Sequence, residues 1–154
     1  MNKYHKLYGA YGSNLNFEQM LSRCPDAAFV GVTMLKGWQL TFRTHATLER
    51  DEKGKTPIGV WGITQSDENE LDLYEGFPSY YRKEMITVEL NGKTVEAMIY
   101  LMNGKFPRLP SEQYYKRILK GYADANLDMT YLENALTDTE MRIGKKNNNG
   151  EDIE

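Results

Sequence analysis

The sequence has little of several features that proteins use for chemistry or targeting. Its 154 residues include a single cysteine, Cys24, so no internal disulfide framework exists. No apolar run approaches the roughly 20 residues of a membrane-spanning helix, and the N-terminal residues lack the apolar core of a signal peptide. The formal net charge is -3, and no basic stripe with interleaved aromatic residues occurs. These absences predict a cytoplasmic protein that binds neither nucleic acid nor membranes.

Cysteine and histidine chemistry has few candidates. Cys24 follows Phe17, Met20 and Leu21 at helical spacing, which places it on an apolar face and predicts a core residue. A nucleophilic cysteine needs a base, and no motif ties either His5 or His45 to Cys24. For His45 we expect a surface or hydrogen-bonded structural role; the alternative is that it faces a pocket. No spacing of side chains typical of a metal site is present.

The remaining composition is that of an ordinary globular domain. Hydrophobic residues make up 40% and charged residues 27% of the chain, and its length suits one domain. Tyrosine is frequent, with 11 residues. Because tyrosine combines an apolar ring with a polar hydroxyl, this predicts either a β-rich core with wet edges or a polar pocket lined by tyrosines.

Strand and helix patterns alternate along the chain. Alternating apolar residues predict strands over 29–42, 58–63, 80–90 and 94–102, with Asn91-Gly92 as a hairpin turn and Gly37 as a bulge. The charged stretch 50–55 predicts a hairpin loop. Helices are expected over 111–125 and, briefly, from Thr130 through Leu136. We therefore expect one α+β domain over residues 1–136 and a polar C-terminal tail over 137–154.

A glycine-containing loop near the start is the first candidate binding element. Tyr8-Gly9-Ala10-Tyr11-Gly12-Ser13-Asn14-Leu15 predicts a strand, a tight polar loop and then a helix capped by Asn16. Unpaired backbone N–H groups of such a loop can bind an anion such as a carboxylate. The alternative is an ordinary strand–turn–helix corner.

Glu75 occupies an unfavourable position for a carboxylate, the last turn of a short acidic helix. Ser66 is the candidate N-cap of this helix, and Gly76 and Pro78 end it. A carboxylate in the last turn lies at the negative end of the helix dipole, which raises its pKa, and aromatic neighbours raise it further by burial. Glu75 is therefore a candidate general acid/base. The earlier carboxylates are expected to form a solvated face; they are Asp67, Glu68, Glu70 and Asp72.

Two motifs in this order resemble the γ-glutamylcyclotransferase family. They are Tyr11-Gly12-Ser13-Asn14-Leu15 and Leu71-Asp72-Leu73-Tyr74-Glu75-Gly76, the second followed by Tyr81. Further segments have family counterparts in the same order, and the similarity covers roughly residues 7–136; these segments are Ala27-Ala28-Phe29, Val60-Trp61-Gly62, Tyr100-Leu101-Met102 and Pro110-Ser111-Glu112-Gln113-Tyr114.

The resemblance implies a fold, a reaction and a site. The fold would be a small mixed β-barrel flanked by helices, and the reaction the cyclisation of a γ-glutamyl amino acid to 5-oxoproline with release of the amino acid. Glu75 matches the family's catalytic acid/base. The positions that match its substrate-binding residues are Tyr8, Gly9, Ala10, Tyr11, Gly12, Ser13 and Asn14 in the loop, and Tyr81, Tyr100 and Tyr114 beyond it. The spacing after Glu75-Gly76 leaves Tyr80 as an alternative to Tyr81.

The resemblance also bears on cofactors, partners and alternatives. It implies a small γ-glutamyl substrate, no metal or organic cofactor, and it allows a homodimer. Asn14-Leu15 differs from the glutathione-specific branch of the family. Two other hypotheses stay open: the same ring closure on a γ-glutamylamine or a γ-glutamyl biosynthetic intermediate, and a non-catalytic module that binds a small metabolite.

Overall fold

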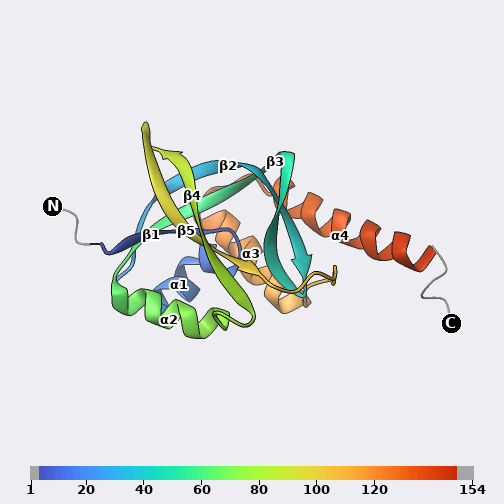
Figure 1. The fold of residues 1–154 in the computed structure, drawn as a ribbon, viewed down its shortest axis with the longest axis horizontal. Coiled ribbons are helices and arrows are strands. Elements are labelled where there is room, and N and C mark those ends of the chain that lie inside the picture. The colour runs from blue at the N-terminus through green and yellow to red at the C-terminus, as the bar shows by residue number, and fades with distance from the viewer. Residues whose placement is uncertain (1–3, 149–154) are drawn as a thin grey trace.

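One five-stranded mixed sheet organises the protein (Figure 1). The computed structural model describes residues 4–148. The strands in chain order are β1 Lys6–Ala10, β2 Ala28–Arg43, β3 His45–Ile63, β4 Tyr81–Leu90 and β5 Lys93–Met102. They are arranged as β2–β3–β1–β5–β4, with β1 antiparallel to β3 and parallel to β5. Strand β1, which leads into the candidate binding loop, is therefore paired with a neighbouring strand on both of its edges.

The sheet consists of β1 and two hairpins. Asn91 and Gly92 join β4 to β5 with φ values of 52° and 81°, which confirms the predicted tight turn. The β2–β3 hairpin differs from the sequence expectation, because it turns at Thr44 and β3 continues through residues 50–55. The predicted hairpin loop is therefore wrong. The charged stretch instead bulges out of the strand pairing opposite Gly37. Gly37 has a φ of 87°, and the bulge predicted at this position is confirmed.

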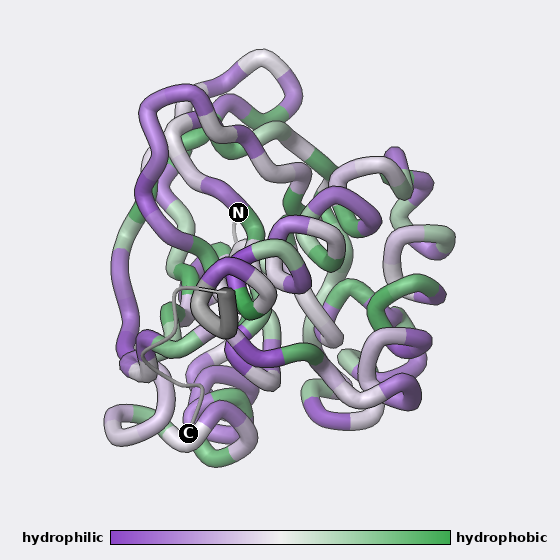
Figure 2. The backbone as a smooth tube through the Cα atoms, turned by 90° about the vertical axis from the view of Figure 1, so that its right-hand side faces the viewer, coloured by the Kyte–Doolittle hydropathy of each residue, from purple (hydrophilic) through white to green (hydrophobic). Residues whose placement is uncertain are grey.

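Helices cover the sheet and its ends. In chain order they are the short 3₁₀ helix η1 Ser13–Leu15, α1 Phe17–Arg23, α2 Gln65–Glu75, α3 Glu112–Asp124 and α4 Thr130–Asn148. Along the helices hydrophilic and hydrophobic stretches alternate, as Figure 2 shows, which is typical of helices with one face on a core. Within residues 4–148, none of the helices combines the length and the apolar character needed to cross a membrane.

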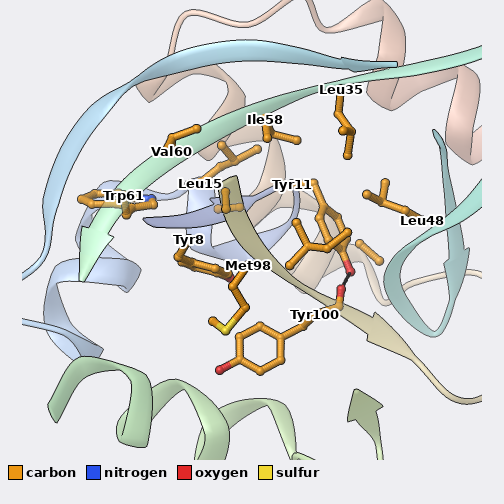
Figure 3. Close-up of a cluster of buried hydrophobic side chains, with 14 of the residues drawn as sticks. Tyr8, Tyr11, Leu15, Leu35, Leu48, Ile58, Val60, Trp61, Met98 and Tyr100 are labelled. Carbon is orange, nitrogen blue, oxygen red and sulfur yellow. Dashed lines mark hydrogen bonds between the residues drawn. The ribbon is translucent and has the colours of Figure 1, made fainter. Parts of the chain in front are cut away.

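The core joins the inner side of the sheet to the binding loop (Figure 3). Trp61 and Ile58 of β3, Met98 of β5 and Leu15 of η1 are each at most 1% exposed. Burying such side chains stabilises a fold by about 1.5–3 kcal/mol each relative to exposure. The loop is therefore a part of the core rather than a surface appendage.

The predicted α+β single-domain class is confirmed, and the sheet is not closed. Strands β2 and β4 form its two edges. Side chains bridge the remaining gap, and one bridge is the hydroxyl of Thr33, which donates to the carbonyl oxygen of Glu89. The mixed sheet flanked by helices thus curls toward a barrel without a hydrogen-bonded seam.

Helix α4 is longer than the sequence pattern predicts. It continues past Leu136, where the sequence predicts a polar tail, because polar side chains anchor it. The Thr139 hydroxyl is fully buried and accepts a hydrogen bond from the amide of Phe42 at 3.3 Å, and Arg142 pairs with Glu49 of β3. Residues 149–154 of the predicted tail lie outside the described residues.

Candidate active site

The binding loop is fixed by groups on three sides. Asn16 caps α1 by accepting a hydrogen bond from the amide of Gln19 at 3.1 Å, as predicted. The indole Nε1 of Trp61 donates to the carbonyl oxygen of Asn14 at 3.1 Å. Leu15 is fully buried in the core. Among residues 4–148, the amides of Ser13 and Asn14 donate to no other residue, so these two amides are free to bind a ligand.

Helix α2 places Glu75 at its last turn. The N-cap is Thr64 rather than the predicted Ser66, because Thr64 and Asp67 form a reciprocal capping box with hydrogen bonds of 3.0 and 3.1 Å. Gly76 ends the helix with a φ of 68°, a left-handed conformation that glycine adopts without steric cost. The chain therefore turns sharply after Glu75 and leaves its carboxylate beside the binding loop.

The Glu75 carboxylate is partly buried and contacts the loop directly. Its Oε2 accepts a hydrogen bond from Nδ2 of Asn14 at 3.2 Å. Burial raises the pKa of Glu75 to about 7, and the nearby Arg23 guanidinium opposes the shift. The predicted upward direction is confirmed. Near neutral pH this carboxyl group exists in both protonation states, as a general acid/base requires.

Glu75 and the loop line one cavity of about 170 Å³. This is smaller than the roughly 300–1,000 Å³ typical of drug-sized ligands, so the cavity suits a small metabolite. Seven tyrosines, two of them in the loop, and one histidine supply most of the lining. The residues around the cavity are Tyr8, Tyr11, Gly12, Ser13, Asn14, His45, Ala46, Tyr74, Glu75, Tyr80, Tyr81, Tyr100 and Tyr114.

All seven tyrosine hydroxyls around the cavity have a hydrogen-bond partner within the protein. Tyr81 donates to the carbonyl oxygen of Ala46 at 2.8 Å, and Tyr114 accepts from the amide of Ala46 at 3.1 Å. The hydroxyl of Tyr11 donates to the carbonyl oxygen of Tyr100 (Figure 3). These bonds fix the rings and leave a rigid aromatic wall.

Both candidate tyrosines after Glu75 line the cavity. Tyr81 is 6% exposed and lies inside it, whereas Tyr80 is 41% exposed and lies at its mouth. The hydroxyl of Tyr80 contacts Nδ1 of His45 at 2.7 Å. His45 is therefore hydrogen-bonded, as expected, and it also lines the cavity, as the alternative proposed; burial lowers the pKa of this imidazole.

Two predicted residues do not reach the cavity. Gly9 and Ala10 pair with Val60 and Gly59 in the sheet, so they support the loop without lining the cavity. The predicted site did not include Ala46 or Tyr74; Tyr74 was expected only as one of the aromatic neighbours that bury Glu75. Tyr74 lies inside the acidic motif next to Glu75, which was a usable signal; Ala46 carries no sequence signal.

The predicted solvated face of α2 is wrong for Asp67 and Glu68. Asp67 is 2% exposed in the capping box, and Glu68 is 4% exposed. Burial opposes ionisation of Glu68, but hydrogen bonds from Lys83 and Lys6 lower its pKa to about 2. The acidic sequence pattern of α2 does not show that Lys6 of β1 and Lys83 of β4 pair with Glu68.

Asp72, a further carboxylate of α2, supports the wall of the cavity. It accepts a hydrogen bond from the hydroxyl of Tyr100 at 2.6 Å and pairs with Lys83 at 2.9 Å. Figure 3 shows the Tyr100 ring with its hydroxyl directed toward α2. Lys83 therefore links the buried Glu68 to a residue of the cavity.

Other reactive groups lie away from this chemistry. Cys24 is fully buried, as predicted, and burial raises the pKa of its thiol to about 12. Within the described part of the chain, no three side chains of His, Cys, Asp or Glu are grouped to hold a metal ion. Glu75 carries the one carboxylate among the residues around the cavity, and burial raises its pKa to about 7.

Comparisons with known proteins agree in sequence and in structure. A family described as gamma-glutamyl cyclotransferase, AIG2-like, matches residues 8–121, a range that contains every residue around the cavity. Gamma-glutamylcyclotransferase of Homo sapiens is 33% identical over 141 residues, which cover 82% of this chain and 75% of the human protein. The Mus musculus protein of the same name is 32% identical over 163 residues, covering 96% and 86%. A solved structure described as gamma-glutamyl cyclotransferase matches with a TM-score of 0.75 at 31% identity, covering 84% of this chain and 85% of the other.

Proposed function

Because the chain belongs to the gamma-glutamyl cyclotransferase, AIG2-like family, we propose that it cyclises a γ-glutamyl amino acid to 5-oxoproline and releases the amino acid. The chain is an enzyme of the γ-glutamylcyclotransferase type. Glu75 acts as the general acid/base. The observation that carries this proposal is the position of the Glu75 carboxylate, with a pKa of about 7, in a small cavity beside the free amides of the loop.

The proposed reaction needs one group that both accepts and donates protons. Ionised Glu75 takes a proton from the α-ammonium group of the substrate, and the freed amine attacks the γ-carbonyl carbon of the same molecule. The new C–N bond closes a five-membered ring, and the bond to the leaving nitrogen breaks as Glu75 returns a proton to it. Overall the ring nitrogen loses two protons and the leaving nitrogen gains two. A carboxyl group with a pKa near neutral suits both transfers.

The loop supplies the second part of the proposal. The free amides of Ser13 and Asn14 are suited to binding the α-carboxylate or the oxyanion that develops on the γ-carbonyl oxygen. Because the nucleophile is already part of the substrate, holding the folded conformer supplies much of the catalysis. Well-oriented intramolecular attack is worth roughly 7–11 kcal/mol of the barrier, and oxyanion donors add about 3–4 kcal/mol each.

The pH dependence of kcat/KM follows from the Glu75 pKa. Glu75 must be ionised to accept a proton, so kcat/KM is expected to rise with pH through about 7. Below that pKa it should fall about tenfold per pH unit. A pH series of 5-oxoproline release tests this. An acidic limb near the ordinary carboxyl value of 4.5 would contradict a buried Glu75 as the base.

The substrate class is tested with a panel of γ-glutamyl-alanine, a γ-glutamylamine and glutathione. We expect 5-oxoproline release from γ-glutamyl-alanine, with the highest kcat/KM of the three. Little turnover of glutathione is expected, because Asn14-Leu15 differs from the glutathione-specific branch. If a folded protein binds 5-oxoproline but turns over none of the compounds, the non-catalytic binding module becomes the better description.

One observation favours the γ-glutamylamine as the second candidate substrate. A γ-glutamyl dipeptide carries a second carboxylate on its leaving group. In the described part of the chain, no Lys or Arg lines the cavity, and burial lowers the pKa of His45. The lining therefore offers this second carboxylate no cation. A higher kcat/KM for the γ-glutamylamine than for γ-glutamyl-alanine would select this class.

A further inference from the structure

Arg23 lies outside the lining of the cavity, yet it contacts two of the residues that form it. It is the last residue of α1. Its Nη1 donates to Oδ1 of Asn14 at 2.6 Å, and its Nη2 donates to Oε1 of Gln19 at 2.8 Å. Its guanidinium carbon lies 3.4 Å from the centre of the Tyr74 ring. Arg23 thus joins α1, the binding loop and the last turn of α2.

The contact with Arg23 sets the orientation of the Asn14 amide. A guanidinium has donors and no acceptor, so the Asn14 atom that faces it must be the oxygen. The amide nitrogen then points the other way, toward Oε2 of Glu75 at 3.2 Å and the hydroxyl of Tyr8 at 2.9 Å. The reversed amide would place its oxygen against the carboxylate of Glu75, and two acceptors repel. Asn14 is 2% exposed, so water cannot easily replace these partners.

The contact of Arg23 with Tyr74 positions the Glu75 carboxylate through α2, the helix to which Tyr74 and Glu75 both belong. Tyr74 precedes Glu75 at the end of α2, and its hydroxyl lies 3.3 Å from the hydroxyl of Ser13. A cation stacked on an aromatic ring contributes about 0.5–1 kcal/mol when exposed and more when desolvated. The stacked guanidinium therefore fixes the last turn of α2 against the loop.

We propose that Arg23 is a positioning residue for Glu75 that acts through the amide of Asn14 and the ring of Tyr74. This inference rests on the proposed acid/base role of Glu75. Arg23 holds the Asn14 nitrogen toward the carboxylate, stabilises its ionised form through that hydrogen bond, and keeps the end of α2 in place. Without Arg23 the amide is free to turn, and the carboxylate loses the one cation among residues 4–148 that acts on it.

The electrostatic surroundings of Glu75 single out Arg23. Seven titratable side chains that share the cavity lining with Glu75 are neutral at physiological pH. They come from β1, the binding loop, β3, the turn before β4, β4, β5 and α3, and they are Tyr8, Tyr11, His45, Tyr80, Tyr81, Tyr100 and Tyr114. Among the described residues, Arg23 is the one charged group that shifts the pKa of Glu75, and it lowers it against burial. Removing this charge should raise the pKa of Glu75.

The experiment measures the Glu75 pKa directly in the substrate-free protein. Carbon-13 NMR of the glutamate side-chain carboxyl groups is followed over pH, and the Glu75 signal is assigned by its absence in Glu75→Gln. Arg23→Met is expected to raise the Glu75 pKa by about one unit, and Arg23→Lys by less because it keeps the charge. Arg142→Met is the matched control, since Arg142 pairs with Glu49 and Asp138 away from the cavity. An unchanged Glu75 pKa in Arg23→Met, or an equal change in Arg142→Met, would overturn the proposal.

The kinetic measurement separates this inference from the proposed function. The acidic limb of kcat/KM in Arg23→Met should move up by the same amount as the NMR pKa, so for a one-unit shift activity falls about sevenfold more at pH 6 than at pH 8.5. A loss that is equal at all pH values indicates a merely structural role and overturns the positioning role. If no compound of the panel is turned over, the proposed function fails while the NMR titration still decides the coupling of Arg23 to Glu75.

Discussion

Replacing Glu75 by glutamine is expected to lower 5-oxoproline release by at least about 10²-fold, a typical contribution of general acid–base catalysis. Glutamine keeps the size and an oxygen that can accept the hydrogen bond from Asn14, but it can neither take nor return a proton. The loss should appear in kcat, because the free amides of the loop still bind the substrate. The measurement is kcat and KM of Glu75→Gln on the compound of the panel that the wild type prefers.

Glu70→Gln is the matched control for this substitution. It makes the same chemical change on the same helix, but Glu70 is exposed and lies away from the cavity. We expect it to keep wild-type activity within about twofold, as for a surface change without partners. If Glu75→Gln keeps wild-type activity, Glu75 is not the acid/base and another group must move the proton.

The stability of Glu75→Gln shows whether a loss of activity comes from lost chemistry or from lost folding. Because the folded state raises the pKa of Glu75 from 4.5 to about 7, the folded state binds more protons than the unfolded state between these values. The stability associated with neutral Glu75 is present below pH 4.5 and is lost as the pH rises through 7. Glu75→Gln should therefore have a free energy of unfolding about 1–3 kcal/mol above that of wild type at pH 8, seen as a higher unfolding temperature, and the difference should shrink toward pH 5.

The sequence predicts those structural features that depend on neighbouring residues in the chain. Glu75 was identifiable because its place at the end of an acidic helix is a local feature, and Gly76 and Pro78 mark that end. The tight turn at Asn91-Gly92 and the cap at Asn16 are local in the same sense. The structure agrees at each of these positions.

Features that depend on partners far away in the sequence could not be predicted from it. Glu68 has the pattern of a surface carboxylate, and only the arrival of Lys6 from β1 and Lys83 from β4 makes its burial favourable. His45 lines the cavity because the β2–β3 hairpin turns at Thr44, a position without a glycine or proline signal. Arg23 has no sequence signal of its own, since its role arises from the packing of α1 against α2.

The second large expected effect concerns Gly121 of α3, where the helix touches the binding loop. Alanine normally stabilises a helix relative to glycine by up to about 1 kcal/mol. At Gly121 a Cβ atom would lie 2.7 Å from the amide nitrogen of Asn16 and 2.7 Å from the carbonyl carbon and the Cβ of Leu15. Two of these three atoms belong to the backbone, so a rotamer change cannot relieve the clash. Leu15 is fully buried and has no free space to move into, so the loop and α3 must separate.

Gly121→Ala is therefore expected to lower the free energy of unfolding by about 1–3 kcal/mol, the usual cost of overpacking. For a chain of this length each kcal/mol corresponds to about 2–4 °C in the unfolding temperature. Because Leu15 and Asn16 directly follow Ser13 and Asn14, KM should also rise at temperatures where the variant is folded. Gly144→Ala on α4 is the matched control, since no atom of the described residues lies within 4 Å of its added Cβ, and it should be neutral or stabilising. Thermal unfolding and substrate saturation curves test both variants, and equal behaviour of the two would show that the contact between α3 and the loop does not hold the loop in place.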